Sequence, residues 1–230
     1  RGLGDVYKRQ VMADGSFRTP FNPRYSSHMK SDYTEGNAFQ WSFFAPHDMD
    51  NFISTIGGKK ELETRLDTLF TTSSQVDGEE ASGDITGLIG QYAHGNEPSH
   101  HMAYLYNWTD SPWKGQERLD QIMQNFYTNA PDGIIGNEDC GQMSAWYVFS
   151  AMGFYPVCPG SGEYVMGAPL FKKAILTLEN GKQIVLNAPD NTNENRYIRS
   201  LKMNGKEYNH NWLKPVSYTH LRAHETGAYL

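Results

Sequence analysis

Cysteine is almost absent from this chain of 230 residues, which contains only Cys140 and Cys158. Two thiols are too few for a disulfide framework or for a zinc site made of cysteine ligands. The sequence leaves open a single bond between the two, but we expect two free and partly buried thiols.

Basic residues are also scarce. Lysine and arginine total 20 against 26 acidic residues, which gives a formal net charge of −6. Proteins that bind nucleic-acid phosphates or an anionic membrane surface normally present a basic patch. The sequence contains no such cluster, so we expect neither kind of partner.

Long apolar runs are missing as well. No run approaches the roughly 18 residues that a bilayer-spanning helix needs, so no membrane span is expected. Apolar residues make up only 38% of the chain, whereas aromatic residues reach 13%. Rings among polar groups are typical of carbohydrate sites, although an aromatic-rich helical core explains the same composition equally well.

The two ends differ in character from the chain between them. Residues 1–10 (RGLGDVYKRQ) and 216–230 (VSYTHLRAHETGAYL) resemble translated sequencing-adapter read-through. We interpret both segments as artefacts and leave them out of the fold reasoning. On this interpretation, any signal peptide would lie upstream of the chain.

Helical patterns dominate residues 11–157. Apolar residues recur there at helical spacing against a charged opposite face, and Ser111 followed by Pro112 is typical of a helix start. The segment at residues 142–152 is apolar almost all round, which predicts an inner helix. The predicted helical segments are residues 36–44, 48–56, 59–70, 101–108, 112–129 and 142–152.

After Gly153 the pattern changes to short, alternating or β-branched runs, at residues 174–178, 183–186 and 197–203. Asn-Gly pairs between and after them predict tight hairpin turns. The sequence therefore predicts a mainly α fold followed by a short antiparallel β region over residues 158–215.

The first of three polar motifs is YTEGNAFQW, residues 33–41, in which Glu35 stands between Tyr33 and Trp41. Burial against such rings would raise the pKa of a carboxyl group toward the working pH, as a general acid requires. The alternative is a glutamate that serves only the positive end of the helix dipole. Trp41 is a candidate for stacking on a sugar or for the core.

His47 and Asp48 follow a proline shortly after this motif. They suit either a sugar-binding pair or a turn that caps the next helix. Trp146, inside the predicted inner helix, is expected in the core.

The second motif is HGNEPSHH, residues 94–101. Its spacing is not that of a His-Glu-x-x-His zinc helix, and Pro98 interrupts a ligand helix. The oxygens of Asn96 and Glu97 suit the hard cation calcium better. For His94, His100 and His101, packing in the core is as good an explanation as contact with a substrate.

The third motif is GNEDCGQMS, residues 136–144, a loop with Asp139 just before an apolar helix. An inverting glycosidase needs a general acid and a general base about 6.5–9.5 Å apart, with room for a water molecule. Glu35 and Asp139, about a hundred residues apart in the sequence, can meet at that separation, whereas adjacent carboxylates cannot. The alternative is again a carboxylate that serves only the helix dipole.

Together the three motifs resemble the catalytic region of family-92 glycoside hydrolases, which are calcium-dependent, exo-acting, inverting α-mannosidases. The resemblance covers about residues 12–212. It implies a partial (α/α)6 toroid over residues 11–157 and part of a β-sandwich over 158–215. It also implies that an N-terminal β-sandwich domain and the other half of the barrel belong to a longer parent chain.

The resemblance assigns roles to individual residues. Glu35 would be the general acid and Asp139 the general base, while Asn96 and Glu97 would bind the calcium ion that contacts the mannose 2- and 3-hydroxyls. The family sometimes has a second acid where this chain has Asn137, which leaves open whether Asn137 orients water or Glu138 compensates. The expected substrate-binding residues are Trp41, His47, Asp48, His94, Asn137 and Glu138.

The implied function is release of terminal α-linked mannose, with an α-1,2 preference, from oligosaccharides such as N-glycans or mannan. The expected location is the periplasm or the exterior of a bacterium. Two other functions stay open: a carbohydrate-binding module without catalysis, and an inverting toroid glycosidase that acts on α-glucosides without calcium.

Overall fold

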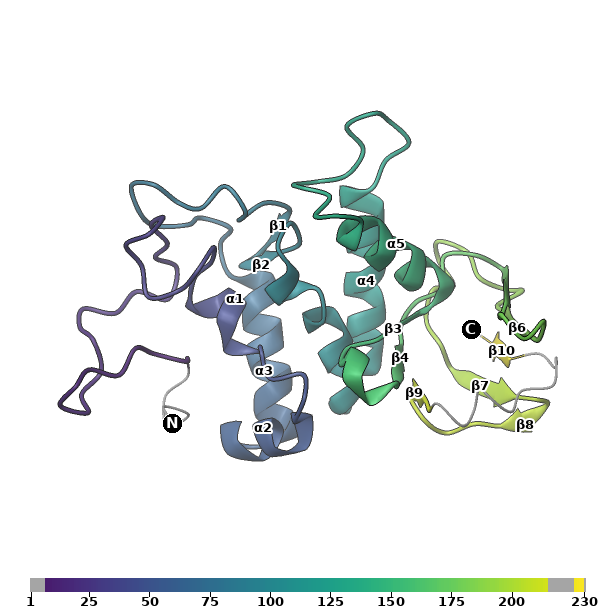
Figure 1. The fold of residues 1–230 in the computed structure, drawn as a ribbon. Coiled ribbons are helices and arrows are strands. Elements are labelled where there is room, and N and C mark those ends of the chain that lie inside the picture. Colours follow the sequence, from purple (N-terminus) through teal and green to yellow (C-terminus); the bar gives the residue numbers. More distant parts are fainter. Residues whose placement is uncertain (1–6, 215–225, 230) are drawn as a thin grey trace. The chain divides into compact units, whose positions relative to one another are not determined.

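The computed structural model describes residues 7–214 and the backbone of residues 226–229 (Figure 1). The chain forms two compact units, each made of two stretches of sequence, and each is described by itself. Unit 1 comprises residues 1–102 and 128–143, and unit 2 comprises residues 103–127 and 144–230. Most of the two terminal segments interpreted as adapter-derived lies outside the described residues, and that interpretation stays a prediction.

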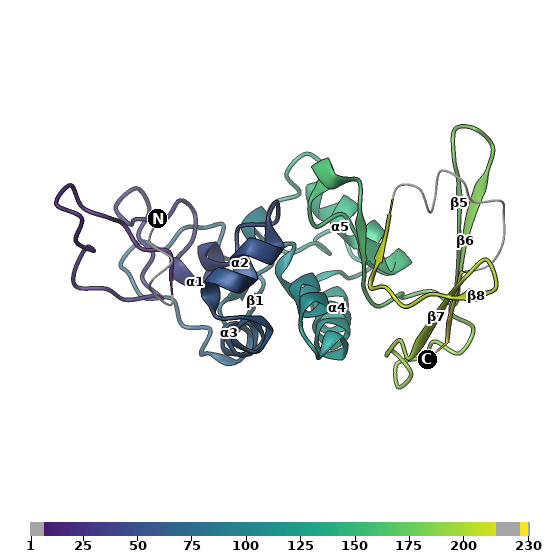
Figure 2. The same ribbon diagram turned by 90° about the horizontal axis from the view of Figure 1, so that it is seen from below.

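The described residues of unit 1 include the α-helices α1 (Ala38–Ser42), α2 (Met49–Ile56) and α3 (Lys59–Thr71), of which α2 and α3 pack together (Figure 2). Helix α2 ends at Gly57, whose φ of 110° lies in the left-handed region that glycine tolerates best. In α3, Leu62, Leu66 and Leu69 are fully buried, as the helical spacing predicts. The three helices confirm the helical segments predicted for this part of the sequence.

A short hairpin follows in unit 1. Strands β1 (Leu88–Ile89) and β2 (Tyr92–Ala93) are antiparallel, and Gly90 in the turn has a φ of 61°. A Cβ atom at Gly90 would lie 2.3 Å from the carbonyl oxygen of Leu69, so only glycine allows the end of α3 to approach this turn. The 3₁₀ helix η1 (Glu97–Ser99) comes next.

Residues 102–108 are helical, as predicted, but form the 3₁₀ helix η2 (Met102–Trp108). Helix α4 (Pro112–Phe126) in unit 2 begins with Pro112, as predicted. Helix α5 (Gln142–Met152) has Trp146 fully buried, which confirms the core position expected of that ring. Val148 on the same helix is 55% exposed, so α5 is an inner helix on one side only among the described residues.

The described part of unit 2 also forms two sheets. Strands β3 (Phe154–Tyr155), β4 (Tyr164–Met166) and β9 (Trp212–Leu213) form an antiparallel sheet, and η3 (Pro159–Ser161) lies between β3 and β4 in the sequence. The larger sheet has the order β5-β6-β10-β7-β8. Its strands are β5 (Lys173–Thr177), β6 (Gln183–Asn187), β7 (Ser200–Met203), β8 (Lys206–Glu207) and β10 (Thr226–Tyr229).

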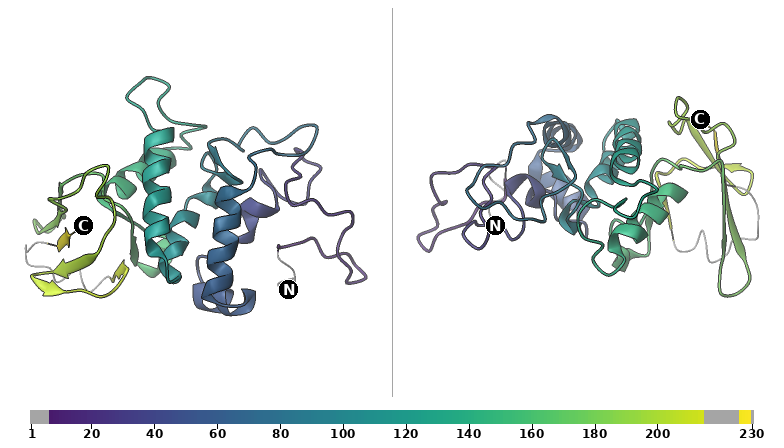
Figure 3. Two further views of the ribbon diagram at one scale, coloured as in Figure 1. Left: turned by 180° about the vertical axis from the view of Figure 1, so that it is seen from behind. Right: turned by 90° about the horizontal axis from the view of Figure 1, so that it is seen from above.

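The turns of the larger sheet agree with the sequence prediction. Strands β5 and β6 form a long hairpin (Figures 2 and 3). Asn204 and Gly205, between β7 and β8, have φ values of 54° and 76°, the conformation that favours Asn-Gly in tight hairpins.

Strand β10 departs from the predicted antiparallel arrangement, because it pairs in parallel with β6 and antiparallel with β7. It lies within residues 216–230, the segment interpreted as adapter-derived. Its position is therefore one that the local sequence pattern did not predict.

The remaining expectations on organisation are partly met. No helix among the described residues has the length and hydropathy to cross a bilayer. Helices followed by small sheets match the predicted order of elements. The closed toroid, and the boundary expected near residue 157, stay predictions.

Candidate active site

Glu35 lies just before α1 in unit 1, and its φ of 52° is in the left-handed region that is unfavourable for a residue with a side chain. Two side chains hold the backbone there. Asn96 Nδ2 donates to the Glu35 carbonyl oxygen at 2.9 Å, and Trp41 Nε1 donates to the carbonyl oxygen of Thr34 at 2.8 Å. The first and second motifs therefore meet at Glu35, and the strain is stored at the candidate general acid.

The expected burial of Glu35 against aromatic rings is wrong, because Glu35 is exposed. The indole of Trp41 turns toward the backbone instead, where a Cβ atom at Gly36 would lie 3.0 Å from Trp41 Nε1. Trp41 also packs edge-on against Phe44, with ring centroids 5.5 Å apart. The direction of the Glu35 side chain therefore depends on its backbone.

The three histidines of the second motif are all buried in unit 1. His100 Nε2 donates to the carbonyl oxygen of His94, and His101 Nε2 donates to that of Phe43, each at 2.9 Å. The hydroxyl of Tyr92 and His94 Nδ1 share a hydrogen bond of 2.8 Å. Of the two explanations that the sequence left open, these contacts agree with packing of the histidines in the core.

Burial also sets the charge of these rings. It lowers the pKa of His100 and of His101 to about 4, and it lowers the pKa of His94 well below its usual value. The imidazoles are thus neutral at pH 7. They act as hydrogen-bonding groups rather than as proton donors of the imidazolium type.

The third motif forms an exposed loop in unit 1 that ends at α5. Asp139 and Cys140 have φ values of 51° and 57°, and Gly141 follows at 96°. Gln142 Nε2 donates to His100 Nδ1 at 3.2 Å, and the Asp139 carboxylate is near enough to raise the pKa of His100 against the larger effect of burial. The candidate base therefore lies beside the second motif, in a strained backbone conformation like that of Glu35.

A close backbone approach supports this junction. A Cβ atom at Gly136 would lie 2.8 Å from Thr86 Oγ1 and 3.2 Å from the Cα atom of Gly95. A Cβ atom at Gly95 would lie only 1.9 Å from Thr86 Oγ1. Glycine at both positions lets the loop of Asp139 reach the segment that holds Asn96.

The other predicted residues take varied positions. Asp48 accepts a hydrogen bond from the backbone N–H of Asn51 at 3.3 Å and caps α2, which is one of the two arrangements that the sequence left open. His47 beside it is exposed, and so are Asn137 and Glu138 in the loop of Asp139.

Both cysteines are free, as expected, and Cys158 is partly buried. The expected burial of Cys140 is wrong, because this residue is exposed in the strained loop.

Among the described residues, no group of three or more His, Cys, Asp or Glu side chains is placed to hold a metal. The candidate side-chain ligands for calcium are therefore limited to the oxygens of Asn96 and Glu97. Asn96 Oδ1 already accepts from the N–H of Glu97 at 3.1 Å but keeps a second lone pair. The carboxylate of Glu97 is exposed. Calcium takes six to eight oxygens, so an ion at this pair would have to draw most of its ligands from backbone carbonyls and water.

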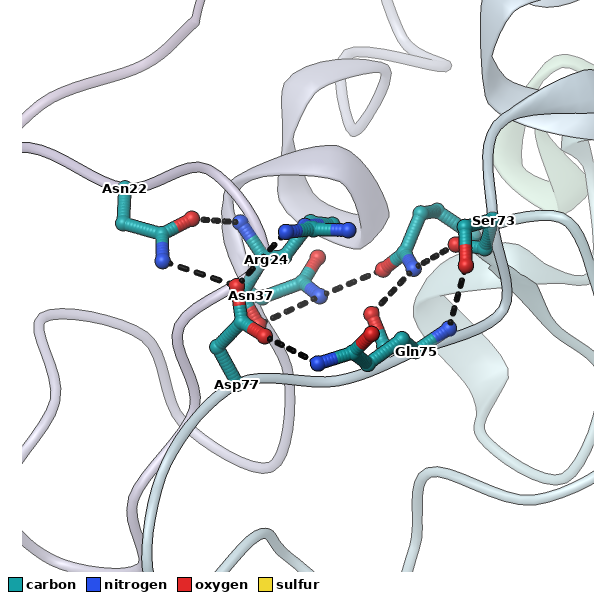
Figure 4. A network of polar contacts seen from close by, with 7 residues as sticks. Asn22, Arg24, Asn37, Ser73, Gln75 and Asp77 are labelled. Atoms are coloured by element: carbon teal, nitrogen blue, oxygen red, sulfur yellow. Dashed lines mark hydrogen bonds and ion pairs between the residues drawn. The ribbon is translucent and has the colours of Figure 1, made fainter.

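Sequence reasoning missed Gln91 and Gln142. Gln91 is fully buried, and it joins Asn37 of the first motif to the backbone of Ser73 and Gln75. Figure 4 labels these three partners in their polar network. An amide residue directly before Tyr92, Ala93 and the histidine cluster is the sequence signal that could have found it. Gln142 stands at the start of an apolar helix, where a polar side chain facing the histidines is the corresponding signal.

Comparisons with known proteins agree on one family. The sequence model described as the glycosyl hydrolase family 92 catalytic domain matches residues 6–226. The chain is 30% identical over 191 residues to an uncharacterized secreted glycosidase of Arthroderma benhamiae, an alignment that covers 82% of this chain and 22% of that protein.

Solved structures show the same similarity. A family GH92 α-mannosidase from Bacteroides thetaiotaomicron, in complex with mannoimidazole, matches with a TM-score of 0.88 and 38% identity over 99% of this chain and 30% of its own. A family GH92 inverting mannosidase from the same species matches with a TM-score of 0.80 and 36% identity, over 97% and 30%. This chain thus spans less than a third of the length of each relative.

Proposed function

Because the chain belongs to glycosyl hydrolase family 92, we propose that it is part of an inverting, exo-acting α-mannosidase that releases terminal α-linked mannose. The observation that carries the proposal is the convergence of the three motifs in unit 1. Asn96 ties the backbone of Glu35 to the second motif, and Gln142 ties the loop of Asp139 to His100. Two solved relatives described as mannosidases, at 36% and 38% identity, support the substrate class.

In the proposed reaction, the carboxyl group of Glu35 gives a proton to the oxygen of the departing glycosidic bond. The carboxylate of Asp139 removes a proton from a water molecule, whose oxygen attacks the anomeric carbon from the opposite face. The bond to the leaving oxygen breaks as the new C–O bond forms, so the configuration inverts. Both residues have φ values in the left-handed region, and strained backbone of this kind is often found at functional sites, which supports the assignment.

Neighbouring groups would position the two proposed catalytic carboxylates. Asn96 holds the Glu35 carbonyl, while neutral His100 and Gln142 support the loop of Asp139. We further propose that Asn96 and Glu97 contribute oxygens to a calcium ion. Such an ion, when bound, would engage the 2- and 3-hydroxyls of mannose and favour a flattened ring.

The remaining site assignments belong to the same proposal. They place a mannose residue against Trp41, His47, Asp48, Asn137 and Glu138. His94, which is fully buried, supports the site from the core instead of touching the sugar. The proposed bond is α-1,2, in N-glycans or mannan.

The proposal includes a longer parent enzyme with an N-terminal β-sandwich and the rest of a toroid. The small share of each relative that the chain covers supports this. Secretion or a periplasmic location is proposed as well, because the curated relative is described as a secreted glycosidase.

The test is mannose release from α-1,2-mannobiose by the full-length enzyme, with the anomer of the first product followed by proton NMR. We expect β-mannose to appear first, and a calcium chelator to abolish the release. Initial α-mannose would refute inversion. Binding of the disaccharide without any release would favour a carbohydrate-binding module, and release that the chelator does not change would remove calcium from the proposal.

A further inference from the structure

Gln91 is a buried side chain with several hydrogen bonds in the turn between β1 and β2. It is 0% exposed, and its Oε1 accepts from Asn37 Nδ2 at 2.9 Å. Its Nε2 donates to the carbonyl oxygens of Ser73 and Gln75, the second at 2.9 Å. Figure 4 shows this network, with Asn37, Ser73 and Gln75 labelled. The amide therefore has partners on both ends and one orientation that satisfies them.

The backbone of Gln91 makes two further contacts. Its carbonyl oxygen accepts from Gln40 Nε2 at 2.7 Å, and its N–H donates to the carbonyl oxygen of Leu69 at 2.7 Å. Gln40 also accepts from the N–H of Asn37 in the capping box of α1. Gln91 is thus hydrogen-bonded to both Asn37 and Gln40 at the start of α1. Its bond to Leu69 connects the start of α1 to the end of α3.

The start of α1 is where Glu35 is placed. Asn37 is 0% exposed and lies two residues after Glu35. On the other side, Asn96 Nδ2 holds the Glu35 carbonyl oxygen at 2.9 Å. One stretch of chain, residues 91–96, therefore holds the Glu35 backbone both directly and through Asn37.

Because Glu35 is exposed, the hydrogen bonds that residues 91–96 make to the start of α1 matter for its orientation. The carboxyl group is not buried, so packing of the side chain does not fix its direction. The φ of 52° is an unfavourable value that persists only while the surrounding contacts impose it. If the start of α1 loosens, the backbone at Glu35 can relax and swing the carboxyl group away from the leaving oxygen.

From this arrangement we infer that Gln91 is a positioning residue for the general acid: its amide, through Asn37, holds Glu35 in the orientation that delivers the proton. The inference rests on the proposed function. It predicts a specific defect, loss of proton delivery, rather than a general loss of activity. A glutamine with only a structural role would not produce that pattern.

The test uses leaving groups of different acidity. Departure of 2,4-dinitrophenolate from its α-mannoside needs no proton, whereas departure of a sugar from α-1,2-mannobiose does. In the full-length enzyme, Gln91→Leu should lower kcat for mannobiose about 10- to 100-fold, because a small misplacement of a catalytic group has effects of that size. The kcat for the dinitrophenyl substrate should stay within about threefold of wild type.

Two reference variants accompany it. Glu35→Gln defines the full loss of proton delivery. Gln116→Leu removes another buried amide, in unit 2, whose Oε1 accepts from the N–H of Ile198 at 2.9 Å. This control should leave the ratio of the two kcat values unchanged.

Should Gln91→Leu fail to melt cooperatively, Asn37→Asp replaces it. That change keeps the oxygen that caps α1 but places an oxygen instead of N–H against Gln91 Oε1, so it should give the same selective loss.

Equal losses on both substrates, or no loss, in the folded variant would overturn the role of Gln91. If Glu35→Gln itself shows no dependence on the leaving group, the assignment of Glu35 fails instead. The two failures are therefore distinguishable.

Discussion

Gly95→Ala should destabilise the junction that brings the second and third motifs together. The new Cβ atom would lie 1.9 Å from Thr86 Oγ1. Rotation of the hydroxyl would still leave a tight contact, because Thr86 Cβ would lie 3.2 Å from the new Cβ atom. Threonine is also restricted in its χ1 rotamers. Overpacking of this kind costs about 1–3 kcal/mol of the free energy of unfolding.

The same change should reduce activity. Gly95 precedes Asn96, which holds Glu35, and it touches Gly136, which begins the loop of Asp139. A shift at Gly95 therefore moves both proposed catalytic carboxylates, and we expect kcat of the full-length enzyme to fall about tenfold or more.

The measurement is denaturant unfolding together with kcat, for Gly95→Ala, Thr86→Ala and the double variant. Thr86→Ala removes the Oγ1 atom that would lie 1.9 Å from the new Cβ, and Thr86 Oγ1 has no hydrogen-bond partner among the described residues, so the double variant should recover at least about 1 kcal/mol. Gly83→Ala is the matched control in unit 1, because a Cβ atom there meets no atom within 4 Å and its φ is not positive. Equal effects at Gly95 and Gly83, or no coupling with Thr86, would refute the reasoning.

Asp139→Asn should lower kcat of the full-length enzyme about 10²–10⁴-fold while isothermal titration shows unchanged mannose binding, and a loss below about tenfold would remove Asp139 as the base. The pKa of His101 is lowered from 6.5 to about 4, so the unfolded state takes up a proton first as pH falls, and stability should drop between pH 6.5 and about 4. Unfolding curves of His101→Phe should show a weaker pH dependence in that window. Ellman's reagent should react quickly with exposed Cys140 and more slowly with Cys158, whereas two unreactive cysteines would indicate a disulfide.

Several features were predictable from the sequence because they depend on residues close together in the chain. The spacing of Leu62, Leu66 and Leu69 predicts the buried face of α3, and Asn204-Gly205 predicts the turn between β7 and β8. The polar motifs likewise identified the family before any coordinates, because their residue types and order are written directly in the chain.

Other features depend on contacts between distant segments, and only the tertiary structure decided them. The sequence placed Glu35 against rings, but Trp41 turns to the backbone of Thr34 and leaves Glu35 exposed. The link from Asn37 to Gln91 spans 54 residues, and no local pattern encodes it. The position of β10 between β6 and β7 is of the same kind.

The histidines of residues 94–101 show most clearly which properties the sequence determines and which the tertiary structure determines. The sequence determined that three imidazoles lie near one another in the chain, and it left core packing and substrate contact equally open. Burial in the folded unit makes these imidazoles neutral at pH 7, because desolvation disfavours the imidazolium and lowers the pKa of His100 and His101 to about 4. Composition and spacing determine which groups are available. Desolvation and long-range backbone contacts exist only once the chain has folded, and they determine how those groups are charged and where they point.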